Sequence, residues 1–292
     1  MSAAHAIGID IGATNIKGVA LTHDGKVLDA VIAQMDHRSN VVESVWRVLK
    51  LLGNVDRVGI AAPGIVRPGG RSIWWMQGRL AEVQGLDWTA ALGRPVPVMN
   101  DANAALLGEV MNGAIACPNV IMLTLGTGVG GAAMVDGNPL RGHLGRAGHL
   151  GHISLDPDAA GDIVNTPGSL EEAIGECTIG PRSDGKYAST TDLVEHLDDD
   201  ELARRVWQKS IRALACGLAS LINVLDPELI IIGGGISAAG DKLFVPLRAE
   251  MEKVEWRPHE RAARIVPAAL GSLAGAIGAG WSAINNAEQN RE

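Results

Sequence analysis

One pattern occurs twice in the chain, near its start and near its middle. It consists of an apolar strand, a turn of glycine and threonine, a second strand and an Asp-Gly turn, and it covers residues 7–25 and 120–138. In both copies a strand follows the glycine turn directly, which predicts a β-hairpin. A chain that repeats such a hairpin at the head of each half is restricted to mixed α/β folds built from two related lobes.

Strands and helices alternate after each hairpin. Amphipathic or small-residue spacing predicts helices over residues 41–52, 102–111, 201–225, 241–254 and 274–284. Short apolar runs predict strands over residues 5–9, 16–21, 27–34, 58–62, 96–99, 120–125, 132–135 and 229–232. We therefore expect an α/β fold with an N-terminal lobe over residues 1–112 and a C-terminal lobe over residues 113–292. The last helix is a candidate to pack back on the N-terminal lobe.

Composition excludes several classes of protein. Of 292 residues, 47% are hydrophobic, which is enough for a sizeable core. The formal net charge of −8 and the absence of a basic strip argue against a nucleic-acid partner. The three cysteines, Cys117, Cys177 and Cys216, form neither a disulfide framework nor a CxxC pair. The N-terminus has no signal-peptide pattern, and no apolar run reaches the roughly 20 residues that span a bilayer. We expect a cytoplasmic protein without a membrane partner.

The glycine turns are candidates for phosphate binding. Gly126-x-Gly128-x-x-Gly131 matches the dinucleotide fingerprint in letters, but that fingerprint requires a helix after the glycines, and here a strand follows. No Walker A loop occurs. A glycine hairpin can still hold phosphate oxygens through backbone amides and the Thr127 hydroxyl. The turn from Asp10 to Thr14 offers the same groups and a carboxylate, which needs Mg²⁺ or water between itself and a phosphate. Either turn alone has an ordinary structural explanation; the pair favours a triphosphate clamp.

Asp101 follows the predicted strand over residues 96–99 and precedes the predicted helix over residues 102–111. A carboxylate in this place can cap the helix. It can also orient a hydroxyl for phosphoryl transfer, a reaction that depends on positioning and charge neutralisation. Spacing alone favours the cap, and one residue can do both.

Four motifs together resemble the ROK sugar kinases, within the superfamily of sugar kinases, heat-shock proteins and actin. The matching segments are Asp10-Ile-Gly-Ala-Thr-Asn-Ile (first phosphate motif), Asn100-Asp101-Ala-Asn-Ala-Ala (catalytic motif), Leu125-Gly-Thr-Gly-Val-Gly-Gly (second phosphate motif) and Ile232-Gly-Gly-Gly-Ile (adenosine-side turn). The resemblance covers nearly the whole chain. It implies the two-lobed actin-like ATPase (ribonuclease H-like) fold, an active cleft between the lobes, and a homodimer.

The resemblance also implies an activity: ATP-dependent phosphorylation of a hexose hydroxyl, normally the 6-OH, with Asp101 as the base. ATP and Mg²⁺ are the implied cofactors, and Asp10 is the implied Mg²⁺ ligand, directly or through water. The residues implied to hold the nucleotide are Asp10, Gly12, Ala13, Thr14, Asn15, Lys17, Gly126, Thr127, Gly128, Gly233, Gly234 and Gly235. Those implied to contact the sugar are Gly64, Gln77, Asn100, Asp101, His149, His152 and Glu171.

The chain departs from the family pattern at the ExGH motif. Here the segment is His149-Leu150-Gly151-His152, so His149 replaces the glutamate. This HxGH variant resembles some bacterial N-acetylmannosamine kinases. A neutral imidazole donates or accepts one hydrogen bond, whereas a carboxylate only accepts. We therefore expect altered hydroxyl selection near C1–C2 of the sugar.

The family's zinc motif, CxCGxxGC, is absent as well. Alignment on Gly168 places Asp162, Val164 and Ser169 at the three cysteine positions. Valine cannot ligate a metal, and neither a carboxylate nor a hydroxyl replaces a thiolate well, so we expect no structural zinc. Glu171 matches a sugar-contacting position, although a carboxylate is also favoured in the first turn of a helix.

A third departure lies between residues 74 and 77. Trp74-Trp75-Met76-Gln77 stands where the family has a sugar-contacting Asn, and Gln77 is the candidate replacement. For the two tryptophans, burial in the core is the favoured interpretation. Stacking on the apolar face of a sugar is the alternative.

Three functions remain open on the sequence. A glucokinase-like hexose kinase is preferred, and a kinase for N-acetylmannosamine or another 2-acetamido sugar is the alternative because of His149. A non-catalytic sugar or nucleotide sensor is the third, although Asp10, Thr14, Asp101 and Thr127 are all retained. A repressor of this family would need a DNA-binding domain ahead of the first phosphate motif, which begins at residue 8, and we do not expect one.

Overall fold

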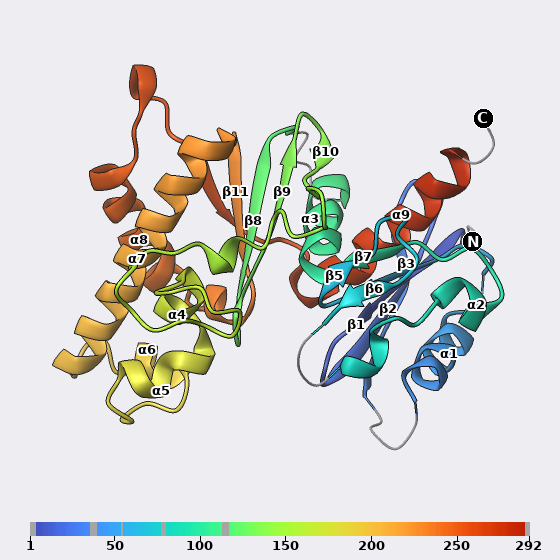
Figure 1. Cartoon of the computed structure of the whole chain (residues 1–292), viewed down its shortest axis with the longest axis horizontal. Coiled ribbons are helices and arrows are strands. Elements are labelled where there is room, and N and C mark those ends of the chain that lie inside the picture. Colours follow the sequence, from blue (N-terminus) through green and yellow to red (C-terminus); the bar gives the residue numbers. More distant parts are fainter. Residues whose placement is uncertain (1–3, 36–39, 54, 77–79, 113–116, 290–292) are drawn as a thin grey trace. The chain divides into compact units, whose positions relative to one another are not determined.

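The computed structural model describes residues 4–35, 40–53, 55–76, 80–112 and 117–289, apart from the side chains of residues 286–289. The chain divides into two compact units (Figure 1). Unit 1 comprises Met1–Ala116, Arg141–Ala147 and Ala269–Glu292, and unit 2 comprises Cys117–Leu140 and Gly148–Ala268. Gln77, which the sequence suggests as a sugar contact, lies outside the described residues.

Unit 1 contains a five-stranded sheet in the order β3-β2-β1-β4-β7. Its strands are β1 (Ala6–Ile11), β2 (Asn15–Leu21), β3 (Val27–Gln34), β4 (Val58–Ala62) and β7 (Val98–Asn100). The first three strands are antiparallel neighbours, and β1, β4 and β7 run parallel. Helix α1 (Val41–Leu52) packs on one face, and α3 (Asp101–Asn112) and α9 (Ala274–Gln289) pack on the other.

Close backbone contacts explain the small residues of α9. A Cβ atom at Gly278 would lie 1.8 Å from the carbonyl oxygen of Ala104 in α3, and one at Gly8 in β1 would lie 1.8 Å from that of Ala276. Only glycine allows backbones to approach this closely. The helix packs on β1, β4 and α3 and extends beyond residue 284, where the sequence predicted its end.

A buried carboxylate anchors the chain at the start of this last segment. Glu109 of α3 is 0% exposed, and its two carboxylate oxygens accept the backbone N–H groups of Ala269 (2.9 Å) and Leu270 (2.8 Å). Ala269 is the residue at which the chain returns to unit 1 from unit 2. Both oxygens of a buried charge are thereby hydrogen-bonded, as burial of a charge requires.

Unit 2 repeats the same arrangement. Its five-stranded sheet has the order β10-β9-β8-β11-β12, with antiparallel pairs followed by parallel ones. The strands are β8 (Val120–Leu125), β9 (Val129–Val135), β10 (Asn138–Pro139), β11 (Leu229–Gly233) and β12 (Arg264–Pro267). The helices are α4 (Leu170–Ile174), α5 (Ile179–Arg182), α6 (Thr190–Glu195), α7 (Glu201–Leu225) and α8 (Asp241–Val254). The common strand order confirms the predicted pair of related α/β halves.

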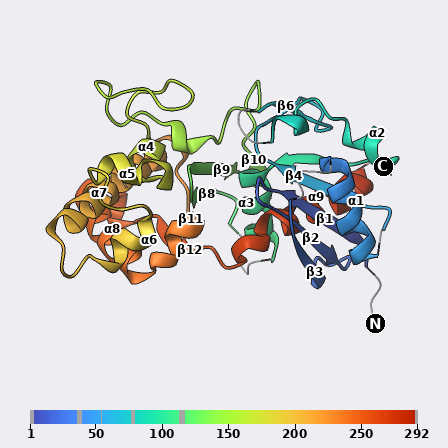
Figure 2. The same ribbon diagram turned by 90° about the horizontal axis from the view of Figure 1, so that it is seen from below.

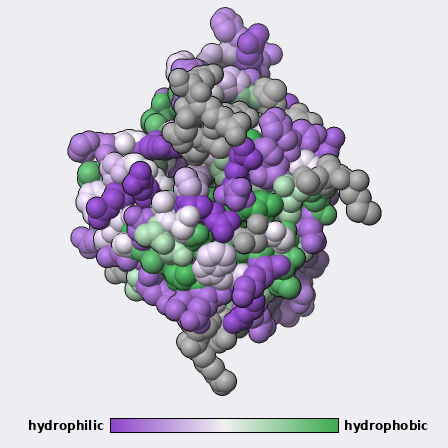
Figure 3. Space-filling model, turned by 90° about the vertical axis from the view of Figure 1, so that its right-hand side faces the viewer, coloured by the Kyte–Doolittle hydropathy of each residue, from purple (hydrophilic) through white to green (hydrophobic). Residues whose placement is uncertain are grey.

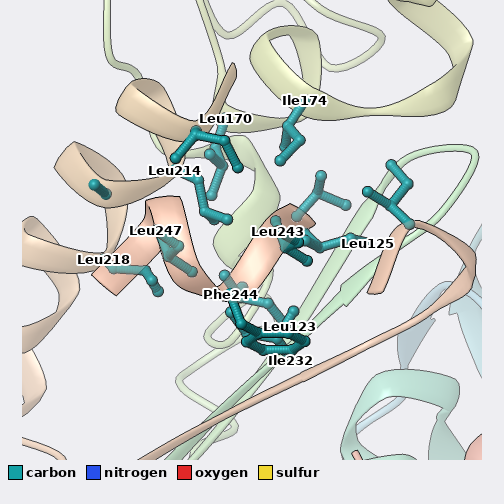
Figure 4. Packing of buried hydrophobic residues seen from close by; sticks show 14 of the residues in the cluster. Leu123, Leu125, Leu170, Ile174, Leu214, Leu218, Ile232, Leu243, Phe244 and Leu247 are labelled. Atoms are coloured by element: carbon teal, nitrogen blue, oxygen red, sulfur yellow. The ribbon is translucent and has the colours of Figure 1, made fainter. Parts of the chain in front are cut away.

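The core of unit 2 lies between its sheet and its helices (Figures 2 and 4). Leu123 and Ile232 from the strands belong to one buried cluster with Leu214 of α7, Leu243 of α8 and Leu170 of α4. Complete burial of each such side chain stabilises the fold by roughly 1.5–3 kcal/mol. The core therefore fixes α4, which carries Glu171, against α7 and β9.

Short elements complete the two units. They are β5 (Ile65–Val66), β6 (Ile73–Trp75), α2 (Trp88–Leu92) and the 3-10 helices η1 (Ala81–Val83), η2 (Leu150–His152), η3 (Glu176–Thr178), η4 (Gly235–Ala239), η5 (Pro258–Glu260) and η6 (Gly271–Leu273). Trp74 and Trp75 are 42% and 44% exposed, so the favoured interpretation that both are core residues is wrong. Both belong to β6, a short strand paired only with β5 among the named strands.

Hydrophilic residues cover much of the face in Figure 3, with smaller hydrophobic areas between them. Within the part of the chain that is described, no helix is both long and apolar enough to cross a membrane.

Candidate active site

The end of β1 brings two carboxylates together in unit 1. Asp10 pairs across the hairpin with Lys17, whose Nζ lies 3.5 Å from Asp10 Oδ2. A Cβ atom at Gly275 would lie 3.0 Å from the same carboxylate, so the first turn of α9 borders it. Burial raises the pKa of Asp10 to about 6, against the opposing charge of Lys17, and nearby Asp101 adds to the shift. Asp10 and Asp101 are therefore electrostatically coupled.

This environment suits a divalent cation. Mg²⁺ is usually held by one or two carboxylates together with waters and substrate phosphates. A cation beside Asp10 would also offset the burial and the repulsion that disfavour its ionised form. The buried carboxylate of Asp10, with Asp101 nearby, is thus a suitable ligand for the Mg²⁺ that the sequence predicts here.

Asn100 determines where Asp101 lies. Its Oδ1 accepts the backbone N–H groups of Ala102 (3.0 Å) and Asn103 (3.2 Å), and its Nδ2 donates to the carbonyl oxygen of Gly64 (3.1 Å). Helix α3 begins at Asp101, one residue earlier than predicted, and Asn100 supplies the cap. The structural explanation of Asp101 as the N-cap residue is thus wrong in detail. Asp101 occupies the first helical position, where its Oδ1 accepts the N–H of Ala102 at 2.9 Å.

The first glycine turn connects β1 and β2. The N–H of Gly12 donates to the carbonyl oxygen of Asn15 (2.9 Å), and the carbonyl oxygen of Thr14 accepts the N–H of Met35 (2.8 Å). Thr14 is exposed, and Gly12 and Ala13 are partly exposed. The backbone of this turn is fixed while its side chains reach the surface, as a phosphate-binding turn requires.

The second glycine turn, between β8 and β9, lies beside the adenosine-side turn in unit 2. The N–H of Gly126 donates to the carbonyl oxygen of Gly128 (2.9 Å). Gly233 pairs with Thr124, and a Cβ atom at Gly234 would lie 2.2 Å from the carbonyl oxygen of Leu125. The structure therefore brings the segments 126–128 and 233–235 together at one end of the sheet.

Glu171 connects the second glycine turn to α4. Its Oε2 accepts the N–H of Val129 at 2.9 Å, and a Cβ atom at Gly128 would lie 2.2 Å from the same oxygen. The carbonyl oxygens of Gly126 and Thr127 accept N–H groups from the segment that follows α4, each at 2.9 Å. The sequence predicted Glu171 as a sugar contact or as a carboxylate favoured in the first turn of a helix, and it does lie in the first turn of α4. The contact of Glu171 with the glycine turn was indicated in the sequence only by the glycine at position 128, where a side chain would collide with the carboxylate.

The HxGH segment lies against the same turn. Residues 150–152 form η2, and a Cβ atom at Gly151 would lie 1.9 Å from the carbonyl oxygen of Val129. His149 precedes η2 and is partly buried. The N–H of Leu170 donates to the carbonyl oxygen of Ile153 at 3.0 Å, which holds the segments of His152 and Glu171 side by side.

The three positions aligned with zinc-binding cysteines also meet in unit 2. Asp162 Oδ2 lies 2.7 Å from His152 Nδ1, Asp162 Oδ1 accepts the N–H of Val164 at 2.9 Å, and the Ser169 side chain hydrogen-bonds to the same carboxylate. No thiolate is present in this set, so its donors do not fit a structural zinc. Across the described ranges, no group of three or more His, Cys, Asp or Glu residues could hold a metal ion. The sequence did not predict Asp162 as a partner of His152.

Two units with one strand order, each with a glycine turn between antiparallel strands, define a protein of the two-lobed actin-like ATPase fold. Residues 6–286 match the model of the ROK family. The chain belongs to the ROK family, which confirms the resemblance found in the sequence.

Several of the relatives that the chain matches are sugar kinases. A glucokinase of Streptomyces coelicolor is 31% identical over 94% of this chain and 95% of its own length. An N-acetylmannosamine kinase of Vibrio cholerae is 28% identical over 80% of this chain and 84% of its own length. The crystal structure of a ROK family glucokinase from Streptomyces griseus, in complex with glucose and AMPPNP, has a TM-score of 0.77 and 27% identity, and covers 95% of this chain and 98% of that one. The predicted enzyme class, a sugar kinase, is confirmed.

Proposed function

We propose that this sugar kinase transfers the γ-phosphoryl group of ATP to the 6-hydroxyl of glucose, with Asp101 as the base. The observation that carries the proposal is the place of Asp101, at the first position of α3, fixed by Asn100 and electrostatically coupled to buried Asp10. A carboxylate held in this way can orient a hydroxyl and accept its proton. The identity to glucokinases and the glucose and AMPPNP bound in the S. griseus relative support the choice of sugar and nucleotide.

In the proposed reaction the sugar oxygen forms a bond to the γ-phosphorus, the bond between that phosphorus and ADP breaks, and the hydroxyl proton passes to Asp101. Asp10, directly or through water, would hold Mg²⁺, which supplies neutralisation of phosphate charge. Lys17 Nζ lies 3.5 Å from Asp10 Oδ2. Ala13 and Thr14 would offer backbone groups to phosphate, because the N–H of Gly12 already donates to the carbonyl oxygen of Asn15.

The residues of unit 2 have the complementary tasks. Thr127 and Gly128 would hold phosphate oxygens, because the N–H groups of Gly126 and Val129 already have partners within unit 2. The turn over residues 233–235 would border the adenosine. Glu171, His149 and His152 would contact sugar hydroxyls.

Further parts of the proposal concern the whole enzyme. The N-terminal lobe over residues 1–112, with the last helix packed back on it, and the C-terminal lobe that begins at residue 113 would close on the substrates and exclude water, which could otherwise take the phosphoryl group. A homodimer and a cytoplasmic location follow from the family resemblance and the composition.

The test is ATP consumption with a panel of glucose, mannose, allose, fructose and N-acetylated hexosamines. Wild type should phosphorylate glucose best, and Asp101→Asn should lower kcat by roughly 100-fold or more, because the proton acceptor is lost. Asp87→Asn is the matched control. Asp87 caps α2 in the same unit, with Oδ1 accepting the N–H of Ala90 at 3.0 Å, and asparagine caps equally well. If wild type binds sugar but no protein consumes ATP, the sensor function replaces the kinase.

N-acetylmannosamine is the second candidate substrate. His149 in place of the family glutamate and the V. cholerae relative favour it. A higher kcat/KM for N-acetylmannosamine than for glucose would overturn the choice of glucose and leave the kinase activity intact.

A further inference from the structure

The segment that follows η2 forms a closed loop. The N–H of Leu155 donates to the carbonyl oxygen of Gly168 (2.9 Å), and Ser154 and Ser169 form an isolated antiparallel bridge. At the far side of the loop the N–H of Asp162 donates to the carbonyl oxygen of Thr166 (2.9 Å). The loop thus returns on itself and places the Asp162 side chain inside, where it is 0% exposed.

Four hydrogen bonds converge on this carboxylate. Oδ1 accepts the N–H groups of Val164 and Thr166, both at 2.9 Å, and Oδ2 faces His152 Nδ1 at 2.7 Å. The Ser169 side chain makes the fourth bond. Burial raises the pKa of Asp162, but the hydrogen bonds outweigh it, so the pKa lies below its usual value. Asp162 is therefore ionised at neutral pH, and an ionised carboxylate only accepts hydrogen bonds.

The Asp162 carboxylate oxygen, 2.7 Å from His152 Nδ1, determines which nitrogen of the imidazole carries the proton. The Nδ1 of His152 must carry a proton in order to donate to Asp162. In the neutral ring the lone pair then lies on Nε2, which can accept a hydrogen bond. The His152 side chain keeps 25% of its surface exposed, so a ligand can reach the ring.

A metal in the place of Asp162 would have the opposite effect. Zn²⁺ binds the lone pair of one imidazole nitrogen, and the other nitrogen then carries the proton and donates. All three positions aligned with the absent cysteines take part in the carboxylate network: Asp162 itself, the backbone of Val164 and the side chain of Ser169. The hydrogen-bond donors of this segment thus stabilise the Asp162 carboxylate, an anion, at the place where the family motif implies a zinc cation.

We propose that Asp162 is a positioning residue that fixes His152 with its proton on Nδ1, so that Nε2 accepts a hydrogen bond from a sugar hydroxyl. The proposal rests on the proposed sugar kinase activity. Nε2 of His152 then accepts a hydrogen bond, whereas the free nitrogen of a zinc-bound imidazole donates one. The protein therefore recognises a hydroxyl donor at the position where a zinc-containing relative would recognise an acceptor.

Asp162→Asn separates this role from a merely structural one. The asparagine carbonyl can still accept the N–H groups of Val164 and Thr166, while its NH₂ group replaces the oxygen opposite His152. The ring must then present its lone pair at Nδ1 and carry its proton on Nε2. Asp156→Asn is the control, because Asp156 lies in the same loop but its Oδ1 accepts only the N–H of Asp158 (3.1 Å) among the hydrogen bonds of the described side chains.

The first measurement is ¹⁵N NMR of histidine-labelled protein, with the His152 signals assigned through His152→Gln. We expect a proton on Nδ1 in wild type and in Asp156→Asn, and on Nε2 in Asp162→Asn. The wild-type spectrum alone decides the matter if the variant does not fold: a proton on Nε2 of the wild-type ring overturns the proposal.

The second measurement is steady-state kinetics with glucose and ATP. Asp162→Asn should raise the KM for sugar roughly 10- to 100-fold, because a donor then faces a hydroxyl that must reorient or lose its bond, and the KM for ATP should change less than about twofold. An unchanged KM for sugar overturns the proposal. So does stoichiometric zinc in protein purified from zinc-containing medium. If wild type phosphorylates no sugar, the proposed function fails, while the NMR result still tests Asp162.

Discussion

Asp10 lies in a place that disfavours its own charge. Its side chain is only 13% exposed, at the end of β1 and beside the first turn of α9. Burial is the largest cause of its raised pKa, Lys17 opposes the shift, and Asp101 adds to it. A carboxylate whose ionised form is disfavoured by the surrounding fold is typical of a functional site. The proposed Mg²⁺ would offset this cost when it binds.

The raised pKa predicts a pH-dependent gain in stability for Asp10→Asn. The folded-state pKa of about 6 lies above the unfolded value of 3.8, so the protonated form stabilises the fold below about pH 4, and this stability is lost as the pH rises through 6. At pH 8 the ionised group disfavours folding by up to about 3 kcal/mol. Asp10→Asn should therefore raise the free energy of unfolding at pH 8 and change it little at pH 4.

Urea unfolding of wild type and Asp10→Asn at pH 4, 6 and 8, without nucleotide, measures this effect. The same variant should have almost no kinase activity, since the proposed Mg²⁺ ligand is gone. A gain of equal size at every pH would show that burial of the charge is not its cause.

The chemical groups of the site could be predicted from the sequence, but their partners could not. Asp10 is the last residue but one of β1 and Asp101 directly follows β7, and a carboxylate at the end of an apolar run is visible in the letters alone. The contacts of Asn100 with Gly64, of Glu171 with Val129 and of His152 with Asp162 connect residues 36, 42 and 10 positions apart. Such contacts depend on how loops fold back, which no local pattern encodes.

At the scale of elements, helices with local stop signals ended where the sequence predicted. Helix α1 starts after the cap of Asn40 and ends at Gly53, which is left-handed with φ of 98°. Helix α7 ends before Asp226, also left-handed, and Pro227 follows. Helix α9 lacks such a signal near residue 284 and continues. Trp74 and Trp75 show a further limit of prediction from the sequence, because an apolar residue type does not by itself tell whether the side chain is buried.

Glu171 makes α4 and the second glycine turn one structural element. Its carboxylate holds the N–H of Val129 at 2.9 Å, and two further backbone bonds connect the turn to the segment after α4. A residue that contacts sugar and also shapes a phosphate-binding turn would couple the two substrates.

Glu171→Ala should accordingly raise the KM for both glucose and ATP, each by roughly 10-fold, because the N–H of Val129 loses its partner. Glu171→Gln retains an acceptor for that N–H, so its KM for ATP should stay near that of wild type while its KM for glucose rises. Steady-state kinetics with each substrate varied in turn makes the measurement, and Glu172→Ala is the neighbouring control. Equal effects of the alanine and glutamine variants on the KM for ATP would contradict the coupling.

At the scale of the whole molecule, two units share one strand order but divide the chemistry. The cross-strand pair of Asp10 and Lys17 in the first hairpin corresponds to Thr124 and Gly130 in the second. The charged groups of the proposed phosphate clamp therefore belong to unit 1, and the neutral turn belongs to unit 2. The repeat was readable in the sequence because glycine turns recur, whereas the close contacts of α9 with β1 and α3 involve segments far apart in the chain.

Gly278→Ala should destabilise the molecule by about 2 kcal/mol or more, although alanine favours a helix over glycine by about 1 kcal/mol. The new Cβ would lie 1.8 Å from the carbonyl oxygen of Ala104, and backbone cannot rotate away. Gly217→Ala in α7 is the matched control, since its Cβ would meet only side chains at 3.4 Å and beyond. Thermal unfolding compares the two. Equal midpoints for both variants would mean that α9 does not pack as described.

Helix α3 carries Asp101 at one end and Glu109 two turns further on, about 12 Å along the axis. The Glu109 carboxylate accepts the backbone N–H groups of Ala269 and Leu270, immediately after the chain leaves unit 2 at Ala268. An α-helix of this length behaves as a stiff rod. A displacement of the segment at Ala269 and Leu270 would therefore act on Glu109 and, along the helix, on the proposed base, without any contact between that segment and the sugar.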